Sequence, residues 1–182
     1  QWEVAQRLMD QPQLESQQPQ RVLDLGCGTG RLTAHLKQRW PKAQVVGVDW
    51  APGMVAQARR RSRWRRQLEL ICADFRQLPI APQSVDLIVC NLALQWCNDV
   101  PDLLNRWRRV LKPGGLLLFS SFGPSTLQEL KAAWARVSDT PHVSEFPDLH
   151  QVGDWLMASG FRDPVMSGET ITATYSDPLD LM

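Results

Sequence analysis

The stretch Val22 to Gly30, VLDLGCGTG, is the part of the sequence that decides the fold. Its first four residues are typical of a buried strand, and alternate glycines then lead toward a helix. A turn of this kind presents backbone N–H groups and a positive helix end to an anionic ligand. A dinucleotide fingerprint would need its third glycine at position 31, which is Arg31. The spacing therefore argues against a nicotinamide cofactor.

Strand-like and helix-like segments alternate on both sides of this turn. Strands are predicted at Arg21–Leu25, Ala43–Val48, Leu68–Cys72, Val85–Asn91, Leu116–Phe122 and Glu169–Tyr175. Helices are predicted at Arg31–Trp40, Pro52–Arg61, Pro101–Leu111, Thr126–Val137 and Asp148–Ser159. Such alternation implies parallel pairing, so the predicted fold is α/β, a doubly wound and mostly parallel sheet.

The chain length indicates a single domain. Its 182 residues fit one continuous core, which we expect at residues 21–122, followed by an acceptor-side region at 123–182. Gln11–Gln20 is polar and is interpreted as a linker, and Lys112–Gly115 is predicted to be a sharp turn before the fifth strand. The chain stops soon after the sixth strand signal, so we expect truncation at its termini.

The composition is that of an ordinary globular protein and names no partner. The formal net charge is +1, with 21% charged and 43% hydrophobic residues. No apolar run reaches the roughly 18 to 20 residues that span a bilayer, and no leader pattern opens the chain, so we expect neither membrane insertion nor secretion. The cysteines lack metal-type pairing, which favours a reducing, cytoplasmic setting without a metal. They are Cys27, Cys72, Cys90 and Cys97.

Two acidic residues extend the predicted ligand site. Asp49 closes the second strand, where a carboxylate can accept hydrogen bonds from both ribose hydroxyls. Asp74 follows the third strand and is positioned to accept from an adenine amino group. Asp86 opens the fourth strand and so is expected at the opposite edge of the sheet.

These residues resemble the class I S-adenosylmethionine-dependent methyltransferases over Arg21–Phe122. The resemblance implies a Rossmann-like fold with S-adenosylmethionine as cofactor. It assigns the methionine part to Gly26, Gly28 and Gly30, the ribose to Asp49 and the adenine to Asp74, with Asp24 orienting the loop or the amino group. The remaining predicted cofactor contacts are Trp50, Met54, Phe75 and Asn91. For the apolar residues Trp50, Met54 and Phe75, packing in the core is the alternative interpretation.

The acceptor decides whether a base is needed. A carboxylate is ionised at neutral pH and needs none, whereas a phenol or carbon acid usually does. His142 and His150 follow the fifth strand and are candidate catalytic residues of an acceptor pocket. His35 is interpreted as a surface or packing residue, and Tyr175 is a further candidate base.

Four further segments sharpen the resemblance, and they extend it over nearly the whole chain. They are Asn91–Cys97, Phe119–Leu130, Pro141–Val143 and Gly160–Met166. Together they resemble the malonyl-[acyl-carrier protein] O-methyltransferases of biotin synthesis. This resemblance implies methylation of the free malonyl carboxylate, which masks its charge for elongation toward a pimeloyl ester. A methyltransferase of a small phenolic or carbon-acid metabolite, and a catalytically silent cofactor-binding partner protein, remain as alternatives.

A run of arginines is a candidate docking surface for the acidic carrier protein. It comprises Arg59, Arg60, Arg61, Arg63, Arg65 and Arg66. The alternative is a solvated helix end, whose cations favour the negative end of the helix dipole. Nucleic acid is not expected as a partner, because Asn91–Leu94 lacks the Asn-Pro-Pro-aromatic motif of base methylation.

Overall fold

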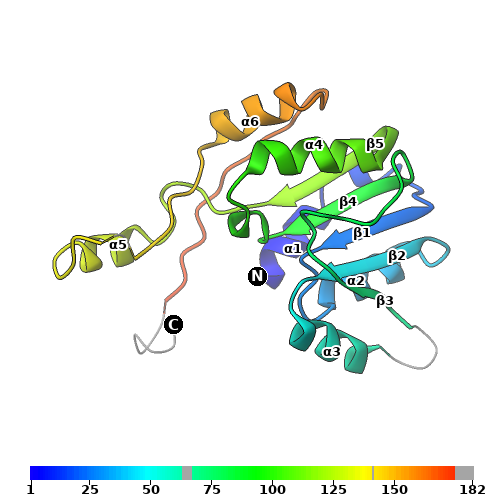
Figure 1. Ribbon diagram of the computed structural model, residues 1–182, viewed down its shortest axis with the longest axis horizontal. Helices are drawn as coiled ribbons and strands as arrows, with labels where there is room; N and C mark the ends of the chain where they lie inside the picture. Colours follow the sequence, from blue (N-terminus) through cyan, green and yellow to red (C-terminus); the bar gives the residue numbers. More distant parts are fainter. Residues whose placement is uncertain (63–66, 141, 175–182) are drawn as a thin grey trace.

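The computed structural model describes residues 1–62, 67–140 and 142–174, and these form a five-stranded sheet flanked by helices (Figure 1). The strands are β1 (Arg21–Leu25), β2 (Gln44–Asp49), β3 (Glu69–Cys72), β4 (Val85–Asn91) and β5 (Leu111–Ser120). The helices are α1 (Trp2–Met9), α2 (Arg31–Arg39), α3 (Pro52–Arg61), α4 (Val100–Val110), α5 (Gln128–Trp134) and α6 (Leu149–Ala158). Short 3-10 turns are η1 (Pro12–Leu14) and η2 (Leu94–Trp96).

The sheet is doubly wound, as predicted. Its strand order is β3-β2-β1-β4-β5, and every pairing is parallel. The chain moves outward in one direction from β1 to β3 and in the other from β4 to β5. The order therefore reverses between β1 and β4, and in open α/β sheets ligands bind at the carboxyl ends of the strands at such a point. The glycine turn after β1 lies there.

Alternate residues of the strands build two core layers. On one face, Leu23 and Ile88 pack with Trp107 of α4, and α6 lies over α4 (Figure 1). On the other face, Val22 and Val89 pack with residues of α1 and α2. Both faces are covered, which explains the nearly continuous apolar character of β1 and β4.

The start of β5 corrects the prediction of a sharp turn before the strand. The strand begins at Leu111 rather than Leu116 and contains Lys112–Gly115 as a bulge: Val85 pairs with Leu111, whereas Leu87 already pairs with Leu116. The Lys112 Nζ donates to Asp86 Oδ1 at 2.7 Å and holds the bulge against β4. Asp86 does lie at the amino edge, where it also accepts from the Arg21 N–H at 2.8 Å.

Two other predictions need correction. Residues 169–174, the described part of the predicted sixth strand, form no strand, because they are exposed and β5 pairs there with no further strand among the described residues. Tyr175 lies outside the described residues. The predicted linker Gln11–Gln20 contains η1, whose Leu14 is buried in the core, so this segment is partly packed rather than a free connection.

Candidate functional site

The glycine turn after β1 is bound to the end of β2. The N–H groups of Gly26 and Cys27 donate to the Val48 carbonyl at 2.8 and 3.0 Å, and the Gly30 N–H donates to the Cys27 carbonyl at 2.9 Å. The Gly28 N–H donates to Asp49 Oδ2 at 2.8 Å. The prediction that the turn presents N–H groups to an anion is therefore wrong for these four, because the chain itself supplies their acceptors.

The glycines are needed for different reasons. A Cβ on Gly26, with φ of +73°, would lie 2.4 Å from the Ala93 Cβ, so η2 packs directly on the turn. A Cβ on Gly30 would lie 2.9 Å from the Ala58 Cβ of α3. Gly28, with φ of +53°, has no atom within 4 Å of its Cβ position. Packing requires Gly26 and Gly30, whereas Gly28 leaves open space at the turn.

Asp49 joins the end of β2 to this turn. The residue is 7% exposed, and its Oδ1 accepts from the Ala51 N–H at 2.9 Å while Oδ2 accepts from Gly28. An ionised carboxylate offers about four lone-pair positions, so two protein donors leave it able to accept further hydrogen bonds. This capacity fits the predicted ribose contact, which stays a prediction.

Asp24 lies beneath the turn on β1. It is 1% exposed, and its Oδ2 accepts a hydrogen bond from the Thr33 hydroxyl at 2.6 Å. Burial raises the pKa of Asp24 to about 7, partly opposed by the Thr33 hydrogen bond. Of the two predicted roles, this position fits orientation of the loop better than a contact with a ligand amino group.

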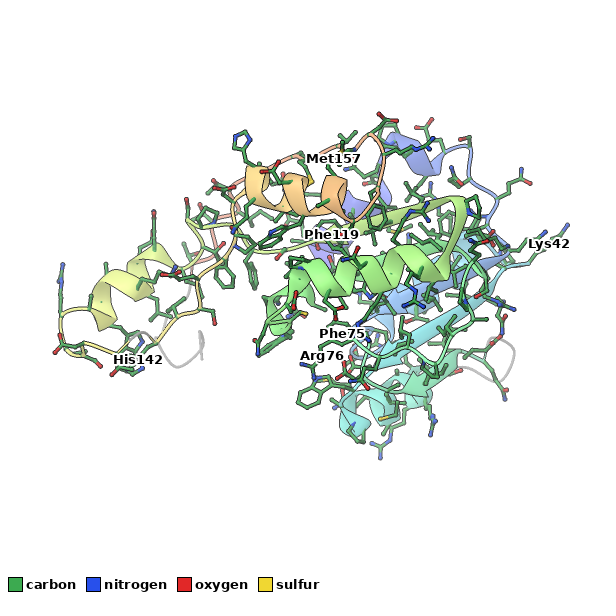
Figure 2. The ribbon with its side chains drawn as sticks, turned by 45° about the horizontal axis from the view of Figure 1, so that its top comes forward. Lys42, Phe75, Arg76, Phe119, His142 and Met157 are labelled. Carbon is green, nitrogen blue, oxygen red and sulfur yellow. The ribbon has the colours of Figure 1, made fainter. Side chains whose placement is uncertain are left out.

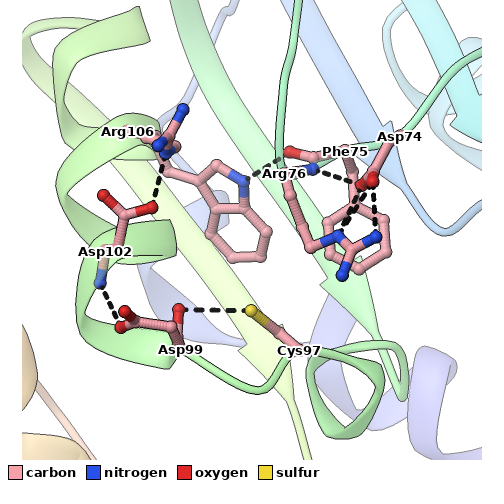
Figure 3. Close-up of polar contacts among 8 residues, drawn as sticks. Asp74, Phe75, Arg76, Cys97, Asp99, Asp102 and Arg106 are labelled. Carbon is pink, nitrogen blue, oxygen red and sulfur yellow. Dashed lines mark hydrogen bonds and ion pairs between the residues drawn. The ribbon is translucent and has the colours of Figure 1, made fainter.

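Asp74 is engaged by a residue that the sequence reasoning missed. The Arg76 Nε donates to both Asp74 oxygens at 2.9 and 2.8 Å, and Nη2 donates to Oδ2 at 2.6 Å (Figure 3). Hydrogen bonding by the Arg76 side chain lowers the pKa of Asp74. The carboxylate is thus ionised and held in place. The predicted adenine contact remains a prediction that must share this carboxylate with Arg76.

The predicted apolar contacts separate into two groups. Trp50 and Met54 are 70% and 43% exposed, so neither packs in the core and both are available to a ligand beside Asp49. Phe75 is 5% exposed and its ring lies 6.2 Å from that of Trp107, whose Nε1 donates to the Phe75 carbonyl (Figure 3). The Phe75 ring is a core element, which the sequence left open.

The end of β4 holds Asn91, a predicted cofactor contact, and η2 after it holds Gln95, which the sequence reasoning did not single out as a site residue. Asn91 Oδ1 accepts from the Ser120 hydroxyl at 2.9 Å, and Leu92 follows with a φ of +50°. Gln95 Nε2 donates to the Leu92 carbonyl at 2.7 Å. Its Oε1 is buried and has no hydrogen-bond partner among the described residues. Strained backbone beside an unpaired buried acceptor is typical of a ligand site.

The two candidate catalytic histidines lie in the acceptor-side region, and their catalytic role stays a prediction. Figure 2 shows His142 at the outer end of the projecting α5 segment, away from Arg76 and Phe119. Its ring stacks on Trp134 with centroids 4.2 Å apart. His150 lies exposed in the first turn of α6. His35 packs against Trp2 with ring centroids 5.7 Å apart, in agreement with its interpretation as a packing residue.

The structure describes three of the six predicted docking arginines. Arg59, Arg60 and Arg61 form the exposed last turn of α3, and the Arg61 Nε donates to the Thr29 carbonyl at 3.2 Å. This arginine therefore supports the glycine turn. The other three, Arg63, Arg65 and Arg66, lie outside the described residues.

A cavity of about 190 Å³ lies beside α4 rather than at the glycine turn. Its walls come from the segment after β3 and from α4, and they include Phe75, Arg76, Arg106 and Arg109. Arg106 is paired with Asp102 at 2.6 Å. The donors and acceptors that converge on the carboxyl edge define a different place, formed by Gly28, Asp49 and the end of β4.

That edge has features that fit a nucleoside ligand. Asp49 offers acceptors suited to ribose hydroxyls, and Trp50 and Met54 offer exposed apolar surface suited to a base. The open space at Gly28 lets a ligand approach the backbone closely. The buried, unpartnered Gln95 Oε1 calls for a hydrogen-bond donor.

Comparisons with known proteins identify the family to which the chain belongs. The sequence profile described as "Methyltransferase domain" matches residues 23–119. The chain is 46% identical over 180 residues to malonyl-[acyl-carrier protein] O-methyltransferase of Halorhodospira halophila, covering 99% of this chain and 61% of that protein. It is 47% identical over 183 residues to the protein of the same name from Xylella fastidiosa, covering 100% and 62%. The chain thus spans less than two thirds of these relatives.

Solved structures with low sequence identity have the same fold. Haemonchus contortus phosphoethanolamine N-methyltransferase 2, in complex with phosphomonomethylethanolamine and S-adenosylhomocysteine, matches with a TM-score of 0.72 at 23% identity, over 89% of this chain and 37% of that one. An S-adenosylmethionine-dependent methyltransferase from Mesorhizobium loti matches with a TM-score of 0.67 at 24% identity, over 87% and 79%. Both likenesses concern the sheet and its helices.

Proposed function

This chain belongs to the methyltransferase domain family, and on that premise we propose that it transfers a methyl group from S-adenosylmethionine to the free carboxylate of malonyl-[acyl-carrier protein]. The observation that carries the proposal is 46% and 47% identity to two proteins of that name over almost the whole chain. The reaction would be an early step of biotin synthesis.

The cofactor would lie across the carboxyl ends of β1, β2 and β3. Asp49 would bind its ribose and Asp74 its adenine amino group, with Trp50 and Met54 against the base. The turn of Gly26, Gly28 and Gly30 would adjoin its methionine part. When bound, S-adenosylmethionine supplies a methyl carbon attached to a sulfonium leaving group. The 2.8 Å hydrogen bond between Gly28 and Asp49 supports this arrangement, because it brings the turn and the acid together.

The chemistry asks little of the protein beyond alignment. A malonyl carboxylate, with an ordinary pKa near 4, is ionised at neutral pH and attacks without a base. With S-adenosylmethionine bound, a carboxylate oxygen would form a bond to the methyl carbon as the carbon–sulfur bond breaks, and the bonding electron pair would remain on sulfur as a neutral thioether. The protein positions the two groups and excludes water. The position of His142, stacked on Trp134 in the projecting α5 segment, favours this acceptor over a phenol or carbon acid, which needs a base.

We further propose that the carrier protein docks on the arginine run Arg59–Arg66. Arg59 and Arg60 are exposed at the end of α3, which also carries the Arg61 bond to the glycine turn. An acidic partner is steered to such a surface, and its association rate falls with salt. Replacing Arg59 and Arg60 with Glu should raise the KM for malonyl carrier protein, while Lys42→Glu, on an exposed lysine just before β2 at the amino edge of the sheet, serves as the control.

We assign residues 1–182 to one methyltransferase domain, with a core at 21–122 and an acceptor side at 123–182, and we expect it to act in the cytoplasm. The four cysteines are all free, which supports a reducing setting. Within the described ranges, no helix is long and apolar enough to cross a membrane.

The direct experiment is mass spectrometry of malonyl carrier protein after incubation with the protein and S-adenosylmethionine. The expected product is heavier by one methyl group, and acetyl carrier protein, which lacks the free carboxylate, should gain none. Methylation of both carrier proteins would show that the free malonyl carboxylate is not the methyl acceptor. Binding of S-adenosylhomocysteine without methylation of either would favour the silent cofactor-binding alternative.

A further inference from the structure

The carboxylate of Asp74 is gripped by a single residue, Arg76. The Arg76 backbone N–H donates to Oδ1 at 2.8 Å, Nε donates to both oxygens at 2.9 and 2.8 Å, and Nη2 donates to Oδ2 at 2.6 Å (Figure 3). Three N–H groups thus meet a carboxylate that offers about four acceptor positions. The Asp74 side chain is 36% exposed, so the remaining acceptor capacity is accessible to a ligand.

The backbone beneath this pair is anchored in the core. The Phe75 ring is 5% exposed, and the Phe75 carbonyl accepts from Nε1 of the buried Trp107 at 3.4 Å. The Gln77 N–H donates to the Asp74 carbonyl at 3.0 Å and closes a turn. Among the described residues, however, Arg76 supplies every hydrogen bond to the Asp74 carboxylate. The direction of that carboxylate therefore depends on Arg76.

Asp74 also lies beside the acid that is assigned to the ribose. Cys72 pairs with Asp49 where β3 and β2 end, and the Ala73 N–H donates to the Asp49 carbonyl at 3.0 Å. The two acids therefore follow neighbouring strands at one edge of the sheet. Because a single glycosidic bond joins a ribose to its base, a nucleoside bound at Asp49 has its base within a limited range. An acceptor for that base must be held in one direction.

We propose that Arg76 is the positioning residue for adenine: it holds the Asp74 carboxylate so that the remaining acceptor position meets the 6-amino group. The inference rests on the cofactor part of the proposed function. Arg76 acts through Asp74 without contacting the base. Its planar fork suits a carboxylate and stays protonated, and its hydrogen bonding lowers the pKa of Asp74, so the acceptor remains ionised. The pair thereby favours adenine over a purine without the amino group.

The test compares two ligands by calorimetry. S-adenosylhomocysteine carries the 6-amino group, and its purine riboside analogue has hydrogen in that place. The unaltered chain should bind the first about tenfold to a hundredfold more tightly, as expected for one hydrogen bond to a charged acceptor. Arg76→Met should reduce this ratio by about fivefold or more, chiefly by weakening S-adenosylhomocysteine. Arg76→Lys keeps the charge but loses the fork, so its ratio should lie between the two.

The chain offers a matched control in Arg106. Its Nε lies 2.6 Å from Asp102 Oδ2, and its side chain is 50% exposed, against 51% for that of Arg76. Arg106→Met removes an ion pair of the same kind and should leave the ratio unchanged. Both pairs lie at the surface, so neither variant should shift the urea midpoint of unfolding noticeably.

The outcomes separate this role from the proposed function. An unchanged ratio in Arg76→Met overturns the role, and so does equal weakening of both ligands, which indicates a structural effect or a direct contact with the base. If Arg76→Met does not fold, an unchanged ratio in Arg76→Lys overturns it. Equal affinity of the unaltered chain for the two ligands would refute the adenine contact and this role but leave the cofactor proposal standing. Failure to bind S-adenosylhomocysteine would refute the cofactor proposal itself.

Discussion

The carboxylate of Asp49 accepts a hydrogen bond from the Gly28 N–H at 2.8 Å, joining the end of β2 to the turn after β1. Its other oxygen accepts from the Ala51 N–H at 2.9 Å, at the start of α3. One buried carboxylate thus organises two neighbouring loops of the carboxyl edge. A change at Asp49 should affect the glycine turn as well as any ligand of the acid.

Asp49→Asn should impair both stability and cofactor binding. An amide can accept at only one of the two N–H groups and turns a donor toward the other, so we expect the free energy of unfolding to fall by about 1 to 3 kcal/mol. Affinity for S-adenosylhomocysteine should fall more than tenfold. Urea unfolding and calorimetry measure the two effects. Asp139→Asn, at an exposed site in the loop after α5, is the control. Unchanged affinity in Asp49→Asn would exclude the ribose contact.

Alanine at the glycines should separate packing from ligand access. Gly26→Ala places a Cβ 2.4 Å from that of Ala93, so we expect a loss above about 3 kcal/mol. Gly28→Ala meets no atom within 4 Å and should cost only the strain of its positive φ, about 1 to 2 kcal/mol. It should nevertheless weaken S-adenosylhomocysteine. Gly53→Ala, within α3, should be neutral or stabilising. Equal losses at Gly26 and Gly28 would contradict the packing of η2.

The buried carboxyl of Asp24 should make stability depend on pH. Its pKa is raised to about 7 by burial, whereas the unfolded chain has the ordinary value near 4. Between these values the folded state holds a proton that the unfolded state has lost. The stabilisation is therefore complete below about pH 4 and is lost as the pH rises to 7.

Asp24→Asn removes this titration and keeps an acceptor for the Thr33 hydroxyl. The unfolding free energy of the variant, relative to the unaltered chain, should rise between pH 4.5 and 7.5, by at most about 1.4 kcal/mol per pH unit. Urea unfolding at several pH values measures this difference. If the difference stays constant over the range, Asp24 has an ordinary pKa.

The cysteine thiols should react with a disulfide reagent in the order of their exposure, and a bound ligand should slow the reaction of the thiol beside Asp49. Cys72 is exposed at the end of β3, opposite Asp49 in the sheet. Cys27 and Cys90 are buried, and burial raises the pKa of both thiols. We expect a disulfide reagent to modify Cys72 first and the two buried thiols only on unfolding. Saturating S-adenosylhomocysteine should slow the first phase. A fast phase that persists in Cys72→Ser would contradict this order.

The histidines should not control methyl transfer. His142 stacks on Trp134 in the projecting α5 segment, and His150 is exposed on α6. His142→Ala and His150→Ala should therefore keep the rate within about twofold from pH 6 to 8, because a carboxylate acceptor needs no base. Initial rates on malonyl carrier protein measure this. A rate that collapses in either variant and falls as histidine protonates would instead favour a phenolic or carbon-acid acceptor.

Local patterns in the sequence were sufficient for much of the fold. The bounds of β1, β4 and α3 were predicted correctly, because buried strands and helix starts have distinct residue patterns. Asp49 was found through its spacing from the glycine turn, since carboxyl ends of neighbouring parallel strands meet at one edge. The start of β5 was not predicted correctly. Its bulge depends on a contact between Lys112 of β5 and Asp86 of β4, which no local pattern records.

The sequence by itself therefore determined the doubly wound sheet, the glycine turn and the acid beside it, all of which follow from local period and chain direction. Only the tertiary structure decided that Phe75 packs on Trp107 in the core, that His142 lies away from the turn and that Gln95 has an unpaired oxygen. These facts depend on contacts between segments far apart in the chain, and no local pattern records which side chains such packing brings together or leaves without a partner.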